Sequence, residues 1–370
     1  MKQSPPLQSI ALTLLIMLAV ALPQAVYAES PSAGKRVLTD MLGRKVEVPD
    51  PLTRVALFGG PTGQIAYILG ARDQLCAVSK ALKASEMLNR FDPTIKDLPA
   101  PRGASGTISI EDLMLSEAQL VIAGDLDASI VEKRTRIPVA YLESDMRRGI
   151  DLLKDEIRFY GNVFRKEARA EKYVLYLENT VALIQSRTRD IPREQRKVVY
   201  NGYSPNRLVT LGGDSFMTER IEMAGCRNAA EAIMTGGKKE GLHVGLVEVS
   251  MEQVLFWNPD IMVIDIGEPE RLFQEAKWKT VKAVQNRKVY KEPVGIFIWN
   301  RPTAESAVLH PLWLAKLAYP DRFKDIDLRE EVKKFYREMM SFNLTDGEAD
   351  ALIKADFDVK FGPLQRKGSN

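Results

Sequence analysis

Arg301 is the residue whose position most clearly indicates a chemical role. It lies in the run Trp299-Asn300-Arg301-Pro302, at the expected start of a helix. A guanidinium there can grip a carboxylate, a phosphate or another oxyanion with two parallel hydrogen bonds. A salt bridge that braces the protein wall is the alternative, and the sequence leaves both open. Asn300 is a polar candidate beside it. The Trp299 ring could stack on a flat ligand, although aromatic residues more often belong to the core.

A glycine pair supplies a second candidate for anion binding. Val55-Ala56-Leu57-Phe58 is an apolar run typical of a buried strand, and Gly59-Gly60-Pro61-Thr62 follows it directly. Glycine lets the backbone approach a ligand, and free amide groups at the start of a helix favour an anion. We therefore expect Gly60, Pro61 and Thr62 to contact a ligand, with a simple tight turn as the alternative.

Three further candidates follow from the positions of expected strand ends. In open α/β sheets, ligands bind outside the carboxyl ends of the strands. This rule selects Asp125, at the end of an apolar strand, and Tyr203, in the expected turn 201–205. It also selects the turn 105–106 and residues 265–268. Arg207 lies shortly after Tyr203 and is a weaker partner for Arg301, with a solvated surface position as its alternative.

Neither a metal site nor a catalytic centre is indicated. The two histidines, His243 and His310, have no ligand spacing to each other or to a cysteine. No nucleophile with its base is visible in the sequence. Cys76 and Cys226 each lie in an apolar stretch, so we expect two buried free thiols. We predict no catalytic residue, no metal ligand and no intrinsic cofactor; a metal would arrive inside a chelate or as an oxyanion.

A sixteen-residue pattern that occurs twice indicates which elements position these candidates. Residues 109–124 align without gaps on residues 250–265: a capping serine, a short amphipathic helix, a polar break and an apolar strand. Two copies of one helix–strand unit predict an α/β fold of two Rossmann-like lobes with mainly parallel sheets. A cleft lies between two like lobes, and small ligands preferentially bind in such clefts.

The segment between the two copies has no strand character. Apolar residues recur at helical spacing from Arg148 to Phe159, Gly161 is expected to break that helix, and 166–188 is a second amphipathic run. At ~1.5 Å per residue the second run would span roughly 35 Å. One long helix is therefore expected to join the lobes and to limit their hinge motion.

The N-terminal residues have the pattern of an export signal. Lys2 precedes the apolar run 10–22, which is too short for a membrane span, and Val26-Tyr27-Ala28 fits a cleavage site. We expect cleavage near Ala28, a periplasmic location, and no lipid anchor because no cysteine lies near that point. The expected organisation is a signal peptide at 1–28, an α/β lobe at 29–147, a helical link at 148–190, a second α/β lobe at 191–325, and C-terminal helices with a polar tail at 326–370.

The charge balance restricts the class of partner. The chain has 52 basic and 49 acidic residues, which gives a formal net charge of +3. A total so close to neutral provides no strong attraction to nucleic acid or to anionic lipid. We therefore expect no nucleic-acid partner, and a monomer that binds a small molecule.

Several segments, in their order and spacing, resemble one known family. They are the alternating run Thr39 to Pro49, which predicts a β-hairpin, then Arg54-Val55-Ala56, Ile221 to Asn228, and Val249 to Asp260. The chain resembles the substrate-binding proteins of ABC importers that have a single helical crossover (class III), the group that carries iron-siderophores, haem and cobalamin. The run 299–302 with Trp313 and Tyr319-Pro320 resembles a subgroup that extends toward binders of molybdate-type oxyanions.

This resemblance implies a function and a partner. It implies capture of a metal chelate in the periplasm and delivery to an importer permease with its ATPase, with a molybdate or tungstate binder as the alternative. It also implies acidic docking residues on each lobe, for which Glu86, Glu219 and Glu222 are candidates. Two hypotheses of other classes remain at this point: a metal-chelatase-like enzyme, and a sensor that reports ligand occupancy.

Overall fold

The computed structural model describes residues 34–103, 106–145, 148–236 and 245–356. The predicted signal peptide, Ser105, His243 and the polar C-terminal tail lie outside these residues. Within the described segments, no helix combines the length and the apolar character that a membrane crossing requires. The description begins with an antiparallel hairpin of β1 (Gly34–Thr39) and β2 (Lys45–Asp50), as predicted from the alternating pattern.

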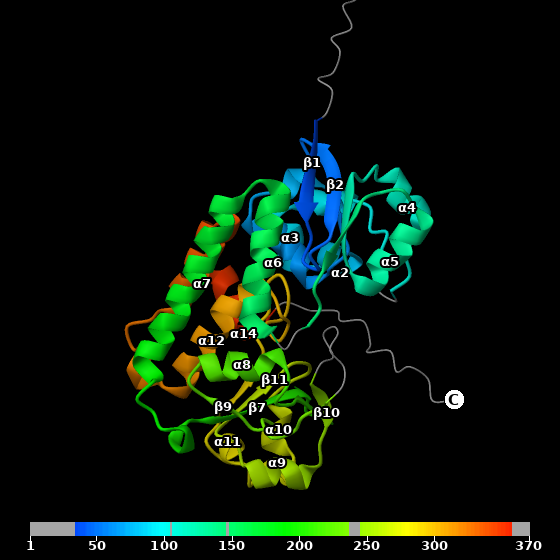
Figure 1. Ribbon diagram of the computed structural model, residues 1–370. Helices are drawn as coiled ribbons and strands as arrows, with labels where there is room; N and C mark the ends of the chain where they lie inside the picture. Colours follow the sequence, from blue (N-terminus) through cyan, green and yellow to red (C-terminus); the bar gives the residue numbers. More distant parts are fainter. Residues whose placement is uncertain (1–33, 104–105, 146–147, 237–244, 357–370) are drawn as a thin grey trace, which may run out of the picture. The chain divides into compact units, whose positions relative to one another are not determined.

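The first lobe is built on a four-stranded parallel sheet (Figure 1), with strand order β4-β3-β5-β6. Its strands are buried along their length, because apolar side chains cover both faces. The strands are β3 (Val55–Leu57), β4 (Leu75–Ala77), β5 (Leu120–Gly124) and β6 (Val139–Leu142). The helices are α1 (Gln64–Ile68), α2 (Lys80–Lys83), α3 (Glu86–Phe91), α4 (Ile110–Leu115) and α5 (Asp125–Arg134).

The second lobe has a six-stranded mixed sheet in the order β10-β8-β7-β11-β12, with β9 also paired to β7. Strands β7, β9, β11 and β12 are parallel, and β8 and β10 run antiparallel to their neighbours. The strands are β7 (Val198–Ser204), β8 (Arg207–Leu211), β9 (Arg227–Asn228), β10 (Leu246–Glu248), β11 (Ile261–Ile264) and β12 (Val289–Lys291). The helices are α8 (Phe216–Met223), α9 (Met251–Trp257), α10 (Arg271–Gln274) and α11 (Lys282–Gln285).

One local prediction in this lobe was wrong. Residues 201–204 were expected to form a turn, but they continue β7, which pairs with β8 as a hairpin. The break in the apolar pattern at Asn201 reflects its side-chain amide, which donates to Asp265 at 3.2 Å and to Glu292 at 3.3 Å. The polar residues are thus part of a strand, and Tyr203 lies near the tip of a hairpin.

Two packed helices, α6 (Gly149–Phe164) and α7 (Glu167–Thr188), occupy the link between the lobes. Gly161 does not break α6 as predicted. Its missing side chain lets α7 approach, because a Cβ there would lie 2.7 Å from the Cβ of Ala170. The chain reverses at Arg165, in the left-handed conformation. The long helix α7 was correctly predicted.

Contacts at the second-lobe helix α8 explain why the link is firmly held. Glu219 accepts a hydrogen bond from the Ile150 amide at 2.9 Å, at the first turn of α6. A carboxylate in this position satisfies an unpaired helix amide and complements the helix dipole. Glu219 therefore has a structural partner within the protein, which lowers its value as a docking candidate.

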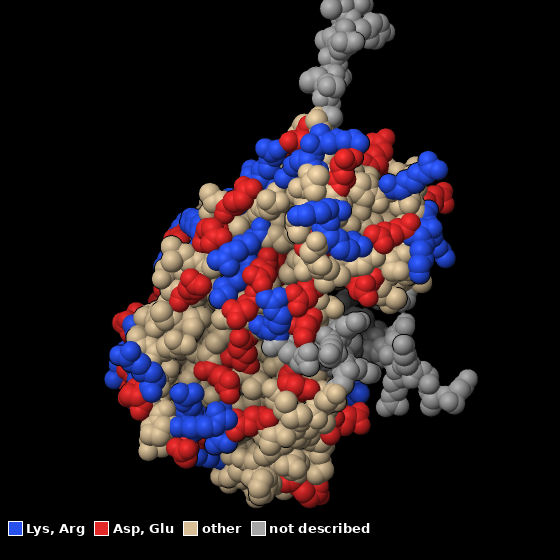
Figure 2. All heavy atoms as spheres, in the orientation of Figure 1, with Lys and Arg blue, Asp and Glu red and all other residues tan. Residues whose placement is uncertain are grey.

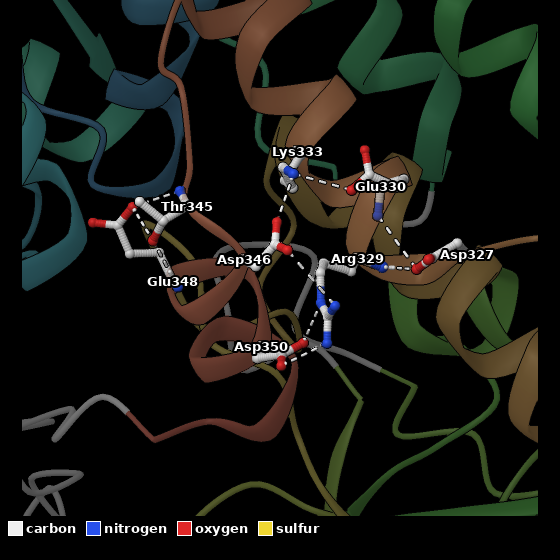
Figure 3. Close-up of polar contacts among 8 residues, drawn as sticks. All are labelled: Asp327, Arg329, Glu330, Lys333, Thr345, Asp346, Glu348 and Asp350. Atoms are coloured by element: carbon white, nitrogen blue, oxygen red, sulfur yellow. Dashed lines mark hydrogen bonds and ion pairs between the residues drawn. The ribbon is translucent and has the colours of Figure 1, made fainter.

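The C-terminal helices α12 (Ala304–Ala318), α13 (Leu328–Met340) and α14 (Asp346–Lys354) complete the fold. Helix α12 begins after the capping residue Thr303, later than the start predicted at Pro302. Figure 3 shows the ion pairs that join α13 to α14, including Arg329 with both carboxylate oxygens of Asp350 at 2.8 Å. Glu348 on α14 also contacts Arg90 on α3 of the first lobe at 2.8 Å. One contiguous apolar cluster includes residues from both lobes, the link and these helices.

Candidate functional site

The carboxyl ends of three parallel strands in the second lobe bring two acidic residues together. The Asp265 amide donates to the Gly202 carbonyl at 2.9 Å, and the Glu292 amide donates to the Ile264 carbonyl at 2.9 Å. These bonds continue the ladders of β7, β11 and β12, so both carboxylates follow directly from strand ends. Glu292 is completely buried. Acidic groups without contact to water need partners or protons.

Asn201, Asn300 and Arg301 surround these carboxylates. The Asn201 side-chain amide donates to Asp265 at 3.2 Å and to Glu292 at 3.3 Å. The Asn300 amide donates to the other oxygen of Asp265, and Arg301 Nη1 donates to the Asn300 side-chain oxygen at 3.0 Å. We call these five residues the strand-end cluster. The structure thus brings predicted Asn300 and Arg301 onto the strand ends that the topological rule selects.

Burial controls the charge of the cluster. It raises the pKa of Asp265 to about 7 and that of Glu292 well above its ordinary value, although the nearby Arg301 charge acts in the opposite direction on both. Each carboxyl group also raises the pKa of the other when it is charged. Near neutral pH the pair therefore carries fewer than two negative charges beside one guanidinium. The cluster can therefore accept an anion more readily than a cluster with two fully charged carboxylates.

The glycine-rich loop of the first lobe is closely packed around Thr62. A Cβ on Gly59 would lie 2.0 Å from the Thr62 hydroxyl oxygen, so glycine is required there for this rotamer. The Thr62 hydroxyl is buried and makes no hydrogen bond among the described residues. It lies close to the buried hydroxyl of Tyr160 on α6, which also makes none. The two hydroxyls are therefore polar neighbours of each other behind the loop, and neither bonds to a further described residue.

Glu156, one turn before Tyr160 on α6, adds a third polar group. Its side chain is only 7% exposed, and burial raises its pKa to about 8. Glu156 is therefore protonated at neutral pH and can donate a hydrogen bond, like the two hydroxyls. One of its oxygens is buried without a partner. Together, Thr62 in the first lobe and Glu156 and Tyr160 on the link helix α6 provide three neutral donors.

A reciprocal pair of hydrogen bonds connects the segments that follow the two candidate loops. Gln64 donates to Glu305 at 2.9 Å and accepts from the Glu305 backbone amide at 3.0 Å. Gln64 lies two residues after Thr62, and Glu305 lies four residues after Arg301. The fold thus brings the glycine-rich loop and the Arg301 loop to the same region.

Trp299 lies in the core of the protein and is 1% exposed. Its indole N–H donates to the Glu305 carboxylate at 3.2 Å, and its ring makes an edge contact with Trp313. Stacking on a ligand would require this ring to leave the core. The structure therefore makes Trp299 a core residue, which was the alternative expected for aromatic residues.

The other predicted residues occupy more open positions. Asp125 is exposed at the first turn of α5, while Gly60 and Pro61 are partly buried. Tyr203 is partly buried, and the Arg207 guanidinium lies 5.5 Å from its ring centroid. Arg207 also contacts Glu248 at 3.2 Å. This hairpin tip presents an aromatic ring and a cation side by side.

Sequence reasoning missed four acidic residues of this region. Asp265 was within a selected range but was not chosen, and Glu292, Glu156 and Glu305 were not considered. The signal for Asp265 was present, because this acid directly follows the apolar strand β11, whereas Glu292 follows Val289-Tyr290-Lys291. Glu156 and Glu305 gave no such signal, since a glutamate in a helix is usually solvated.

The structure also tests the sequence predictions about cysteine and histidine. Cys76 and Cys226 are buried free thiols, as predicted, and burial raises the pKa of Cys226 to about 12. His310 is buried and packs 5.6 Å from Trp313, measured between ring centroids. Within the described segments, no group of three or more His, Cys, Asp or Glu side chains is arranged to hold a metal ion.

The surface shows mixed charge and two hollows that lie elsewhere. Figure 2 shows basic and acidic side chains interspersed over the visible face, in keeping with the balanced composition. Hollows of about 460 and 270 Å³ are lined by residues of the C-terminal helices and by residues around Asp40, respectively. Neither hollow includes a predicted site residue.

Comparison with known proteins gives consistent matches over most of the chain. The family model described as periplasmic binding protein matches residues 55–293. The molybdate-binding protein MolA of Haemophilus influenzae is 26% identical over 327 residues, which are 82% of this chain and 90% of MolA. The solved structure of MolA with bound molybdate has a TM-score of 0.70 at 25% identity and covers 84% of this chain and 99% of its own.

A solved periplasmic solute binding protein from Veillonella parvula has a TM-score of 0.75 at 25% identity, covering 87% of this chain and 97% of its own. These matches agree with the two α/β lobes and the helical link described above. They also agree with the resemblance drawn from the sequence. The chain therefore belongs to the periplasmic binding protein family, as a class III substrate-binding protein of ABC importers.

Proposed function

We propose that this protein captures an oxyanion of the molybdate or tungstate type and delivers it to an ABC importer. The observation that carries the proposal is the position of Arg301 at the carboxyl ends of β7, β11 and β12, held through Asn300. A guanidinium in this position offers two parallel donors to an oxyanion. Burial keeps the neighbouring carboxyl groups from fully cancelling its charge.

The first lobe and the link helix α6 supply the complementary groups in this proposal. Residues Pro61 to Gly63 form a short 3-10 helix that leads into α1, and the Gly60 and Thr62 amides near its start suit an anion. Thr62, Glu156 and Tyr160 add neutral donors, each with a buried oxygen that makes no regular hydrogen bond among the described residues. Neutral donors hold a multiply charged oxyanion without the desolvation cost of further ions. Asp125, which is exposed, would add repulsion, so it belongs at the rim.

The similarity to MolA supports the same cargo. MolA is a molybdate binder by name, and it matches nearly its whole length to this chain. The predicted cargo of the main interpretation, an iron-siderophore, haem or cobalamin, has weaker support, because the solved relatives whose titles mention iron or nickel are at most 19% identical. Likeness at that level extends to the fold alone.

A metal chelate is the second candidate, and the hairpin tip favours it. Tyr203 and Arg207 present a ring and a guanidinium together, a pair that can contact a flat or aromatic chelating group. A chelate would need these two residues, whereas a small oxyanion held at Arg301 would not. The two candidates are therefore distinguishable by their dependence on one arginine or the other.

Calorimetric titration of the purified protein can test both candidates. The panel contains molybdate, tungstate, sulfate, phosphate, two ferric siderophores, haem and cobalamin. We expect molybdate and tungstate to bind, Arg301→Ala to weaken their binding more than tenfold, and Arg207→Ala to change it less than twofold. Both variants should keep the wild-type melting temperature within a few degrees.

The outcomes separate the candidates clearly. Binding of a chelate that depends on Arg207 and Tyr203, with no heat from molybdate or tungstate, would replace the oxyanion proposal by the chelate proposal. Molybdate binding with equal affinity in wild type and Arg301→Ala would remove the arginine from the site. Sulfate binding as tight as molybdate binding would contradict selectivity for the larger oxyanion.

We also propose transport as the role of capture, since the family serves ABC importers. The enzyme alternative would require turnover of a bound ligand, and the sensor alternative would require signalling in cells that lack the permease. Export with cleavage near Ala28 and a monomeric state belong to the same proposal. Intact mass of the secreted protein and sedimentation analysis check these two points.

A further inference from the structure

The strand-end cluster holds two acidic groups and one cation: Glu292 is fully buried, and Asp265 and Arg301 are partly buried. Asp265 and Glu292 share one amide donor, Asn201, and Asp265 is also tied to Arg301 through Asn300. In the described structure the Arg301 charge acts on both carboxyl groups. The cluster is therefore electrically coupled: a change at the guanidinium changes the proton affinity of both acids.

An arriving oxyanion changes that balance. Molybdate is a dianion at neutral pH, and contact with Arg301 places its two negative charges near the Asp265 carboxyl. Charges a few ångströms apart inside a protein interact by several kcal/mol, far more than in water. A negatively charged carboxylate beside a bound dianion is thus strongly disfavoured. Either the anion is rejected, or the carboxyl group becomes neutral.

We propose that capture of a dianionic oxyanion at Arg301 is coupled to the uptake of one proton from solvent by the Asp265–Glu292 pair. This inference rests on the proposed function, because it requires an anion at Arg301. The bound state then contains the guanidinium, the dianion and two neutral carboxylic acids. Once neutral, an acid can donate its new O–H to the oxyanion and becomes part of the binding site.

Beside the neighbouring titratable groups, the Asp265–Glu292 pair is the one that changes its protonation near neutral pH. His310 on α12 lies 3.3 Å from Glu292, but burial lowers its pKa to about 3, so it stays neutral. Burial lowers the pKa of Arg220 on α8 to about 10, so it stays charged. Tyr200 on β7 faces Asp265, and burial with that charge raises its pKa above the ordinary value.

Proton uptake on binding determines how the affinity for the oxyanion changes with pH. Binding raises the pKa of a carboxyl group, so the bound state holds more protons than the empty state between the two pKa values. Affinity must therefore fall as pH rises above about 7, the value for Asp265 in the empty protein, by up to tenfold per pH unit. Below that value both states are protonated, and the affinity becomes flat.

Isothermal titration with molybdate at pH 7.5, in two buffers with different heats of ionisation, measures the protons taken up. We expect between about half and one proton per molybdate bound to wild-type protein. Asp265→Asn should bind without proton uptake, and its affinity at pH 8.5 should exceed that of wild type. Glu292→Gln provides a second variant if the first has a lowered melting temperature.

Glu270→Gln is the matched control. Glu270 lies five residues after Asp265, is exposed, and is outside the range 265–268 selected as ligand-binding. Removing its charge should leave both proton uptake and the pH profile unchanged. Molybdate binding to wild type without proton uptake, and with equal affinity at pH 7 and pH 8.5, would overturn the inference. Absence of molybdate and tungstate binding at every pH would instead overturn the proposed function, and this inference with it.

Discussion

The two copies of the helix–strand unit, α4–β5 and α9–β11, keep the same local geometry with different residues. Ser109 and Ser250 each accept a hydrogen bond at 3.2 Å from the amide three residues later. Glu117 and Asn258 occupy equivalent positions after the helices, and both have the left-handed conformation. The helical break and the cap are thus reproduced by residues that differ in charge and size.

Gln119 and Asp260 show that a side-chain amide and a carboxylate can perform the same structural role. They hold the same position in the two copies, just before the strands. The Gln119 side chain accepts from the Thr53 and Arg54 amides at 2.9 and 3.1 Å, and Asp260 accepts from the Val198 amide at 2.9 Å. Each side chain therefore anchors the first residues of the neighbouring strand. The amide in place of the acid in the first lobe affects the strength of this anchor, and not its existence.

The two copies differ at their last position, which in the second lobe belongs to the candidate site. The first ends at Gly124, around which an added Cβ would meet open space, and the second ends at Asp265, in the strand-end cluster. A shared framework thus ends in a glycine directly before helix α5 in one lobe and in a partly buried acid beside a guanidinium in the other. The architecture is repeated, but the chemistry of the site is asymmetric.

The largest expected difference between the copies comes from their anchors. Asp260→Ala should lower the free energy of unfolding by about 2–3 kcal/mol, because it removes a charge-assisted bond to a strand amide. Gln119→Ala should cost about 1 kcal/mol, since its bonds are neutral and partly exposed. Urea denaturation at pH 7 measures both values. Equal losses would show that the carboxylate adds nothing to the anchor.

Low pH should reduce the difference in the free energy of unfolding between the Asp260→Ala and Gln119→Ala variants. Burial opposes the charge on Asp260, but Lys282 and the Val198 amide outweigh it and hold its pKa below the ordinary value. The stability that Asp260 contributes is therefore present above pH 4 and is lost as pH falls through its folded pKa. The gap between the two variants should accordingly narrow below pH 4. A gap at pH 3 as large as the gap at pH 7 would indicate packing loss as the cause.

A smaller effect should be equal in the two lobes. Ser109→Ala and Ser250→Ala each remove one cap acceptor of the same length and geometry. Loss of such a cap costs about 1 kcal/mol. The same urea experiment should give two losses that agree within about 0.5 kcal/mol. Unequal losses would mean that the two helices differ in some contact beyond the shared cap.

The fold was predictable because its signals are local and repeated. The capping serines, apolar strands and the long run 166–188 all formed as the sequence indicated. Two predictions failed because a tertiary contact decided the outcome. Gly161 stays helical since its missing side chain packs against Ala170, and 201–204 stays extended since β8 pairs with it.

The candidate site was only partly predictable, for a related reason. Arg301 and the glycine-rich loop were identified from residue type and position alone. Trp299 could not be distinguished from a surface ring, because its burial depends on Glu305 and Trp313. The role of Glu156 depends on a hydrophobic environment that the sequence of α6 does not reveal. Buried acids were missed because burial itself is a tertiary property.

The smallest effect should come from the apolar residues that both copies expose at the same position. Leu115 is 73% exposed at the end of α4, and Phe256 is 83% exposed at the end of α9. Leu115→Gln and Phe256→Gln should change the free energy of unfolding by less than about 0.5 kcal/mol, because neither side chain is removed from water on folding. Sedimentation should give the same mass for wild type and both variants. A loss above 1 kcal/mol in either lobe would show that this side chain is packed in solution, and the two copies would then differ in their packing as well as in their chemistry.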